Sequence, residues 1–417
     1  MMEITYKAIR GTSKGYYILV AILAVLSLAG VYSTWLMHEH GVALTGMNNR
    51  VAWGLQIIMA VYYIGLSAGS LVVSGLYGVF GKIDYKPFAR LAAYLAMLFL
   101  IAGMLSILTD QGRLIRVFIE PFVHFNLSSM FSINPGLYGG HIVLCVIYLF
   151  ALFREMPRLT KVSAYVVVCW AIVVHSGTAA IFGFVPRELY QSPLLPPSFV
   201  AAALASGAAF MIICLVLLFK LTKRHLDGGL VIWLGQLTGV FVIAVLYFIL
   251  IENLHRFYMV ESRDAALHFL FEGFNGVLFW GGMLLVGFIV PLIIFFGPWG
   301  KTVPGTVTAA AMVVFGVLCE RYIIVIPGLI HPADLFPGME IVPTPAAYAA
   351  YTAVEGVASY TPTFLELLQA FGVLGIFGLM FVLGIKYMPL LPTEGRIPEP
   401  SKAVEAPVSE SARRAGG

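Results

Sequence analysis

The chain has 417 residues, of which 60% are hydrophobic and only 11% are charged. Its mean hydropathy of +0.92 lies far above that of soluble domains, so the sequence is that of an integral membrane protein. The apolar runs extend over about twenty residues, which predicts transmembrane helices and excludes a barrel, whose strands cross a membrane in about ten residues of alternating polarity. The net charge of +4 is explained below by orientation, and we infer no nucleic-acid binding from it.

Ten apolar segments predict an all-α protein with ten membrane spans. They run from Gly15 to Met37, Ala52 to Phe80, Phe88 to Thr109, Leu137 to Phe153, Ser163 to Val185, Ser198 to Leu221, Gly229 to Ile251, His268 to Phe296, Pro304 to Ile326 and Phe364 to Tyr387. No small-residue cleavage site follows the first run, so we interpret it as an uncleaved span. Residues 1–388 then form one polytopic membrane domain, and residues 389–417 are predicted to be a disordered tail.

Lysine and arginine residues are distributed unevenly between the two sides of the predicted bundle. The side that holds both termini and the loops after the even-numbered spans carries eighteen of them, and the other side carries six. Because positively charged loops are retained in the cytoplasm, both termini and the tail are predicted to be cytoplasmic. We therefore expect a multi-pass protein of the cytoplasmic (inner) membrane.

The stretch from Thr109 to Gly136 lies on the outer side and concentrates polar side chains between two spans. These are Asp110, Arg113, Arg116, Glu120, His124, Asn126, Ser128 and Ser129. Such a group is costly next to a membrane unless it borders water or holds a ligand. We therefore predict that this stretch contains the functional site.

A second outer segment, from Pro327 to Thr363, is 37 residues long and contains no Lys or Arg. Long loops usually carry function or a docking surface, and an acidic, aromatic surface suits a partner protein. The alternative is a solvated lid that closes the end of the bundle.

Polar residues within the spans are candidates for a proton or ligand path. On the second span they recur at helical spacing and line one face: Gln56, Tyr63, Ser67, Ser70, Ser74 and Tyr77. Elsewhere the candidates are His141, His175, Glu252, Glu320 and Arg321. The alternatives are packing of small residues, hydrogen-bonded core histidines and an ion-pair network at the outer rim. Since adjacent helical residues point about 100° apart, we expect Glu320 and Arg321 to pair with other spans.

The cysteines show no spacing typical of a metal site. All four fall inside apolar runs without a CxxC pair: Cys145, Cys169, Cys214 and Cys319. We interpret them as small buried apolar side chains, so an iron–sulfur cluster or zinc site held by this chain alone is not expected.

Six stretches of the sequence form a specific combination. They are TGMNNRVAWGL (residues 45–55), TDQGRLIR (109–116), HFNLSSMFSINPG (124–136), the run from Val174 to Gly207, CERYIIVIP (319–327) and YTPTFLE (360–366). In these stretches the chain resembles the NrfD/PsrC family of membrane subunits of polysulfide reductase and related complexes. It is most similar to the ten-span branch, which includes DsrP-like and alternative-complex-III-like proteins. One departure is Tyr190, where many relatives carry tryptophan.

The resemblance implies two four-helix bundles, at residues 52–186 and 198–326, plus two flanking helices. It implies a quinone site at the outer end of the first bundle, and a role as the quinone-interacting membrane anchor of a respiratory oxidoreductase, not catalytic alone. Electrons would pass between the menaquinone or ubiquinone pool and a ferredoxin-like iron–sulfur subunit on the outer face. The iron–sulfur subunit would in turn exchange electrons with a catalytic subunit, which contains molybdopterin or is a multihaem cytochrome. The quinone is an exchangeable substrate, and no haem or metal is expected in this chain.

Such a site needs hydrogen-bonding groups, a proton acceptor and access from lipid. The predicted catalytic residues are Asp110 and His124. The predicted quinone-binding residues are Trp53, Asn49, Gln56, Arg113, Phe125, Asn126 and Ser129. The candidates for proton translocation are His141, His175, Tyr63, Glu252, Glu320 and Arg321. A secondary transporter and a ligand-free membrane anchor are the alternative functions.

Overall fold

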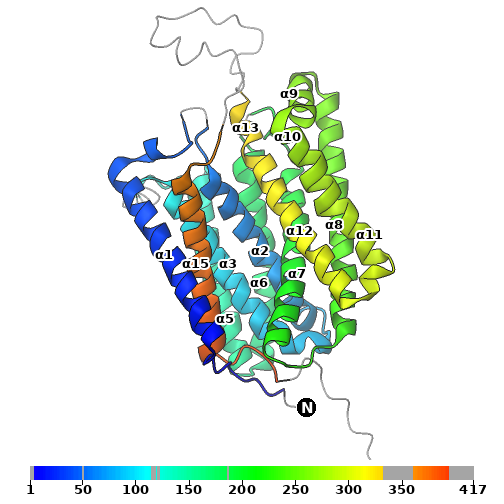
Figure 1. Ribbon diagram of the computed structural model, residues 1–417. Coiled ribbons are helices and arrows are strands. Elements are labelled where there is room, and N and C mark those ends of the chain that lie inside the picture. The colour runs from blue at the N-terminus through cyan, green and yellow to red at the C-terminus, as the bar shows by residue number, and fades with distance from the viewer. Residues whose placement is uncertain are drawn as a thin grey trace, which may run out of the picture.

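The computed structural model describes residues 4–48, 51–113, 119, 123–185, 187–331 and 360–393 (Figure 1). Ten of its helices are long and apolar enough to cross a membrane, which confirms the predicted all-α protein with ten spans. Nine spans are built on the long helices α1 (Lys14–His40), α2 (Leu55–Gly78), α3 (Ala89–Asp110), α5 (Met130–Phe153), α6 (Pro157–Gly183), α7 (Leu195–Leu221), α8 (Gly228–Tyr258), α12 (Val303–Val325) and α15 (Phe364–Tyr387). The remaining span joins α10 (Gly273–Val277), the π-helical η3 (Leu278–Ile289) and α11 (Val290–Phe296).

Shorter helices lie at the two ends of the bundle. They are η1 (Val42–Leu44), η2 (Ile83–Phe88), α9 (Val260–Phe271), η4 (Trp299–Lys301) and α13 (Pro327–Ile330). We call the end of the bundle that holds Asp110 the Asp110 end, and the opposite end, which holds Lys82, the Lys82 end. In Figure 1 the Asp110 end is at the top, and α9, α10 and α13 lie there.

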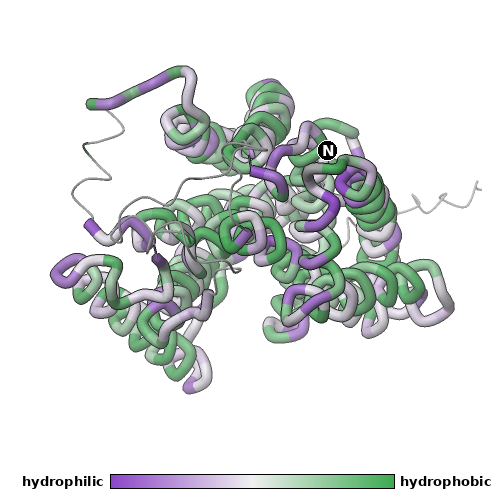
Figure 2. The backbone as a smooth tube through the Cα atoms, turned by 90° about the horizontal axis from the view of Figure 1, so that it is seen from above, coloured by the Kyte–Doolittle hydropathy of each residue, from purple (hydrophilic) through white to green (hydrophobic). Residues whose placement is uncertain are grey.

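The helices pack as two groups and a flanking pair. Helices α2, α3, α5 and α6 contact one another, as do α7, α8, α12 and the span formed by α10, η3 and α11. The groups are joined where α2 packs against α7 and α12, while α1 packs almost entirely on α15, which rests on α3. Seen from above, the helices are coloured mostly as hydrophobic residues along their length, as spans in lipid require (Figure 2).

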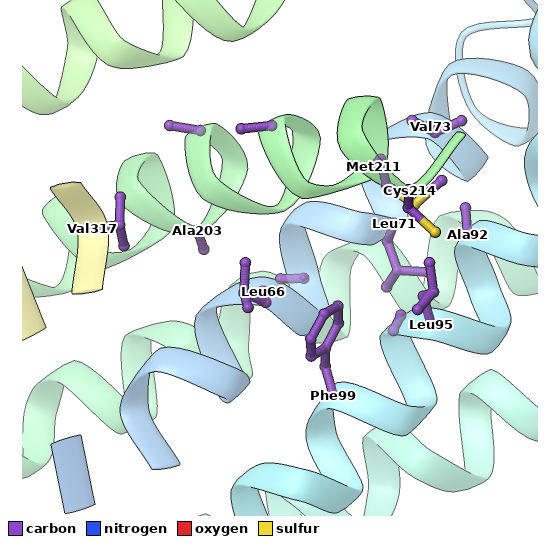
Figure 3. Close-up of a cluster of buried hydrophobic side chains, with 14 of the residues drawn as sticks. Leu66, Leu71, Val73, Ala92, Leu95, Phe99, Ala203, Met211, Cys214 and Val317 are labelled. Atoms are coloured by element: carbon purple, nitrogen blue, oxygen red, sulfur yellow. The ribbon is translucent and has the colours of Figure 1, made fainter. Parts of the chain in front are cut away.

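The core lies where the two groups meet. Figure 3 shows part of this buried cluster, with Leu66, Phe99, Ala203, Met211 and Val317 contributed by α2, α3, α7 and α12. Here Gly69 of α2 lies against Gly207 of α7, and a Cβ on either would overlap the other's backbone. Small residues at this crossing allow the close helix approach that drives association in lipid, where the hydrophobic effect between helices is absent.

Replacing Gly69 with alanine is therefore expected to separate α2 from α7. Overpacking of this kind costs about 1–3 kcal/mol, so the unfolding temperature of the purified protein should fall by several degrees. Gly65→Ala is the matched control: it lies one turn away on the same helix, and its Cβ would meet open space. Equal melting temperatures for the two variants would contradict the assignment of this contact.

Several predicted span boundaries are wrong: α6 begins at Pro157 and not at Ser163, and α8 ends at Tyr258 and not at Ile251. Helix α5 begins at Met130 and not at Leu137, because Pro135 and Gly136, which read as a break in the sequence, lie within its first turns. Pro135 is the sixth residue of α5, so it lies inside the helix and leaves the carbonyl of Phe131 without its usual i+4 donor. The eighth span begins at Gly273 and not at His268, because Gly273 has a positive φ of 59° that ends the continuity with α9.

The prediction of four buried cysteines is wrong for one of them. Cys145, Cys214 and Cys319 are buried, whereas Cys169 on α6 is exposed. An apolar residue of a membrane span faces either the bundle or lipid, and the sequence of a uniformly apolar run does not distinguish the two. Cys169 therefore belongs to the outward surface of the bundle.

The predicted tail begins later than expected, because its first residues pack against the Lys82 end. Leu390 and Leu391 are fully buried, and the backbone N–H of Lys7 donates to the carbonyl of Leu391. Arg224 donates to the carbonyl oxygens of Leu391 and Pro392 at 3.1 and 2.8 Å. The rest of the tail, residues 394–417, lies outside the described residues.

Candidate functional site

A cavity of about 110 Å³ lies at the Asp110 end between α2, α3, α5 and α6. Apolar side chains form most of its wall, and Gln111, Asn134, Tyr138 and Thr178 provide its polar groups. We call it the first-bundle cavity. An apolar pocket with a few polar groups is typical of a site for a small lipophilic molecule.

Trp53 forms one end of this cavity at the entry to α2. Its ring lies 5.6 Å from that of Phe131, 5.3 Å from that of Phe182 in an edge-to-face arrangement, and 6.2 Å from that of Tyr190 in a stacked one. Tyr190 is held in place by its hydroxyl, which donates to the carbonyl of Val325. Tyrosine thus supplies a stacking face at the position where the resemblance expected tryptophan.

Asn134 carries an unpaired acceptor in the wall of the cavity. Its amide nitrogen donates to the carbonyls of Met130 and Gly177 at 2.7 and 2.9 Å, while its buried Oδ1 has no partner among the described residues. By contrast, the hydroxyls of Tyr138 and Thr178 form a hydrogen bond with each other at 3.0 Å. A buried acceptor without a donor costs about 1–3 kcal/mol. Oδ1 lies against Gly177 of α6, so a ligand hydroxyl in the cavity would pair with it when the amide turns toward the cavity.

Asp110 is buried at the C-terminal end of α3, next to the cavity residue Gln111. One carboxyl oxygen accepts a hydrogen bond from the backbone of Gly54, the neighbour of Trp53, and the other, Oδ1, is buried without a partner in the part of the chain that the structure describes. The carboxyl group of Glu366 is close enough to interact with it electrostatically. Asp110 is thus a buried carboxyl group that does not itself line the cavity but precedes the lining residue Gln111 in the chain.

Glu366 connects α15 to this end of the first bundle. Its carboxylate accepts from the backbone of Gly46 at 2.8 Å, from the backbone and hydroxyl of Thr363 at 2.9 and 3.1 Å, and from the hydroxyl of Tyr360 at 2.6 Å. Burial and the Glu366 carboxylate raise the pKa of Tyr360, so its phenol stays protonated and donates. Glu366 therefore has four donors, whereas Asp110 beside it accepts from Gly54.

The other predicted ligand residues lie apart from the cavity. Gln56 is buried but faces α15, where its Nε2 donates to the backbone of Glu366 at 2.8 Å. Arg113, His124, Phe125 and Asn126 are exposed, and none of them lines the cavity. Asn126 and Ser129 shape the turn before α5, because the Asn126 carbonyl accepts from the Ser129 backbone at 3.0 Å. Asn49, Arg116 and Glu120 lie outside the described residues.

Five of the predicted proton-path residues are buried, and each is close enough to the next to interact electrostatically, although no hydrogen bond between described residues joins them. His141 interacts electrostatically with His175, His175 with Arg321, Arg321 with Glu320, and Glu320 with Glu252. This group links α5 and α6 of the first bundle with α8 and α12 of the second. The sixth candidate, Tyr63, lies elsewhere, stacked on Phe99 and Phe377.

We expected the ion-pair partners of Glu320 and Arg321 to come from other spans, and this prediction is wrong. Arg321 lies 3.8 Å from Glu320 itself, while its guanidinium covers the ring of Phe199 of α7 at 4.2 Å. All three side-chain nitrogens of Arg321 are buried, and no described residue accepts a hydrogen bond from them. Glu252 instead pairs with Arg256 one turn later at 2.7 Å.

His175 bridges α6 and α2. Its Nδ1 lies 2.7 Å from the carbonyl oxygen of Ala171, and its Nε2 lies 2.8 Å from that of Ile64. A neutral imidazole has one N–H, so only one of these carbonyls accepts a hydrogen bond unless the ring gains a second proton.

Sequence reasoning missed Asn134, Tyr138, Thr178 and Glu366. Asn134 and Tyr138 are one turn apart on α5, and they were assigned to a loop and a span start because Pro135 obscured the helix. The Thr363–Glu366 spacing is a capping-box pattern, and it was the available signal for Glu366. Among the described residues, no group of three or more His, Cys, Asp or Glu side chains is arranged to hold a metal ion.

Comparison with known proteins gives the family. The model of the polysulphide reductase NrfD family matches residues 43–333. The chain belongs to the NrfD family. This NrfD-family chain is 38% identical to the Hdr-like menaquinol oxidoreductase integral membrane subunit of Archaeoglobus fulgidus, over 98% of this chain and 100% of that protein.

More distant relatives also align over most of their length. A selenate reductase subunit of Mesobacillus selenatarsenatis is 27% identical, with 88% of this chain and 93% of that protein covered. The menaquinone reductase integral membrane subunit of Nitratidesulfovibrio vulgaris is 22% identical, with 88% and 90% covered. The matched family region of this NrfD chain contains the first-bundle cavity but neither α1 nor α15.

Proposed function

We propose that this chain is the quinone-interacting membrane subunit of a respiratory oxidoreductase complex, and that the first-bundle cavity binds the quinol head group. The observation that supports this most directly is the buried Oδ1 of Asn134, which no described residue pairs with, in an otherwise apolar wall. A quinol hydroxyl can donate to this oxygen, whereas a quinone carbonyl cannot. The reduced form is therefore the preferred ligand.

Asp110 is proposed to accept a proton when the quinol is oxidised. Oδ1 of Asp110 is buried and has no partner within the described ranges. Gln111, which follows Asp110, lines the cavity, and Gly54, which donates to Asp110, follows the lining residue Trp53. Trp53 and Phe131 would flank the ring, and the surrounding apolar side chains would exclude water. The bound quinone supplies the two-electron chemistry, and the chain supplies orientation and proton transfer.

The excess of Lys and Arg at the Lys82 end supports an orientation with both termini in the cytoplasm. The first-bundle cavity then lies at the outer face. Protons that leave a quinol through Asp110 would be released outward, and electrons would pass to a separate iron–sulfur subunit. The alternative of a ligand-free anchor leaves the acceptor of Asn134 without a function.

The loop before α5 is proposed as part of the docking surface for that subunit. Val123, Phe125 and Leu127 are 65%, 57% and 73% exposed, and they lead directly into Phe131 of the cavity wall. Arg113 and His124 lie in the same exposed region of the chain. A partner that covers these apolar side chains would place its redox centre close to the quinol.

The buried group from His141 to Glu252 is proposed to move protons between the bundles. His175 stands at its centre, since its two ring nitrogens face carbonyl oxygens on α6 and α2. If proton translocation by the reconstituted complex is unchanged in both His175→Gln and Glu320→Gln, this path is contradicted.

Replacing Asn134 with leucine tests the binding site. We expect the affinity of the purified chain for a quinol analogue to fall about tenfold, because a hydrogen bond to a buried acceptor contributes about 1–1.5 kcal/mol. Asn253→Leu is the matched control: its Nδ2 donates to the Ile249 carbonyl at 2.7 Å and its Oδ1 has no described partner, but it lies on α8 away from the cavity. Equal loss of affinity in both variants would contradict the assignment, as would no loss in Asn134→Leu.

A further inference from the structure

We propose that a second quinol binds in the cavity between α1, α3 and α15, which we call the flanking cavity. This inference rests on the proposed function, since it takes the ligand class from it. The flanking cavity has a volume of about 360 Å³, within the range of pockets that hold small organic ligands. It lies at the Asp110 end, because its wall includes Thr109 and His38.

Two buried polar atoms in this wall have no partner in the described part of the chain. Gln369 is 1% exposed and donates through Nε2 to the sulfur of Met37 at 3.2 Å, while its Oε1 makes no hydrogen bond to any described residue. Nδ1 of His38 is also buried and makes no hydrogen bond to any described residue. Both residues line the flanking cavity with their unpaired atoms buried in its wall, so a ligand there satisfies these atoms when the Gln369 amide and the His38 ring turn toward it.

The chemistry of the wall selects the ligand. Gln369 Oε1 accepts only, so the ligand must bring an O–H or N–H donor. The remainder of the wall is mostly apolar, with Trp35, Leu108 and Val373 among its side chains. A lipid acyl chain would leave Oε1 unpaired, and a phosphate head group would find His38 but no lysine or arginine among the described residues that line the cavity. A dihydroxy aromatic ring with an apolar tail fits both requirements.

The flanking cavity is separate from the first-bundle cavity but adjoins the same carboxyl groups. The two cavities use different positions of α3 and its C-terminal end: Thr109 lines the flanking cavity, and Gln111 lines the first-bundle cavity. Asp110 lies between these two residues in the chain, and Gln369 follows Glu366 by one helical turn. A quinol in the flanking cavity would therefore contact residues that lie one position from Asp110 on α3 and one turn from Glu366 on α15.

The helices α1 and α15 that form this cavity lie outside the matched family region, residues 43–333. Their packing is close, because Gly30 and Gly372 meet backbone to backbone. The flanking pair thus adds to the family core a site that the core alone does not contain. A ligand in this cavity would account for the unpaired buried polar atoms of Gln369 and His38.

The test is a binding titration of the purified full chain with a hydroxyquinoline quinol analogue, whose fluorescence is quenched on binding. We expect two sites per chain. Gln369→Leu should remove one site and leave the site that Asn134→Leu affects. Ile376→Trp, which fills the flanking cavity without touching its polar atoms, should have the same effect as Gln369→Leu. Gln236→Leu, an exposed glutamine on α8, is the control and should retain both sites.

The outcomes separate this proposal from the proposed function. A single site that Asn134→Leu weakens, and that neither Gln369→Leu nor Ile376→Trp changes, would overturn the flanking site alone. A single site lost in Gln369→Leu and unaffected by Asn134→Leu would support the flanking site and overturn the first-bundle assignment. If native mass spectrometry shows that Ile376→Trp expels a copurified phospholipid while analogue stoichiometry stays the same, the cavity holds lipid and the proposal is wrong.

Discussion

Replacing Asp110 with asparagine is expected to lower the rate of quinol oxidation by the complex about 100-fold or more, because a positioned general base contributes about 10²–10⁴-fold. Asparagine keeps the size of the side chain and the hydrogen bond from Gly54, but it cannot take up the proton. Quinol affinity should change little, since Asn134 and the ring contacts remain. The measurement is the steady-state rate at saturating quinol, together with analogue binding.

The control for this prediction is Asp84→Asn, an exposed carboxylate at the Lys82 end whose rate should match that of the unchanged protein. An Asp110→Asn complex that oxidises quinol at the normal rate would exclude Asp110 as the proton acceptor. A rate loss explained entirely by weaker binding would instead assign Asp110 a structural role at the wall of the cavity.

Replacing Arg321 with methionine is expected to lower the free energy of unfolding by about 3–5 kcal/mol, which is the usual cost of removing one partner of a buried ion pair. Arg321 is fully buried, and Glu320 at 3.8 Å is 3% exposed, so the substitution leaves a carboxylate in an apolar interior without its cation. The loss of the guanidinium over Phe199 adds to this effect. The measurement is denaturation of the purified chain in mixed micelles.

A double variant distinguishes the loss of charge balance from the loss of packing. Glu320→Gln combined with Arg321→Met removes both charges and should recover most of the stability, because no unpaired charge remains. Lys301→Met, an exposed cation at the Lys82 end, should change stability by less than about 0.5 kcal/mol. Normal stability in Arg321→Met alone would contradict the buried ion pair.

The position of the site could be predicted from the sequence only in part. The stretch from Thr109 to Gly136 does supply residues of the first-bundle cavity, namely Gln111, Phe131 and Asn134. Charge and polarity, however, directed attention to Arg113 and His124, which are exposed. Neutral residues form the polar part of the wall, because an uncharged ligand in an apolar environment is held by amides and hydroxyls at lower desolvation cost than by ions.

The sequence by itself determined the ten membrane spans, because the free energy of placing about twenty apolar residues in lipid depends on composition and hardly on neighbours. It also determined the family, through motifs whose residues are local in the chain. Only the tertiary structure decided which polar atoms stay unpaired within the described residues. The free Oδ1 of Asn134 and Oε1 of Gln369 depend on what distant helices place opposite them, and that is a property of packing between spans.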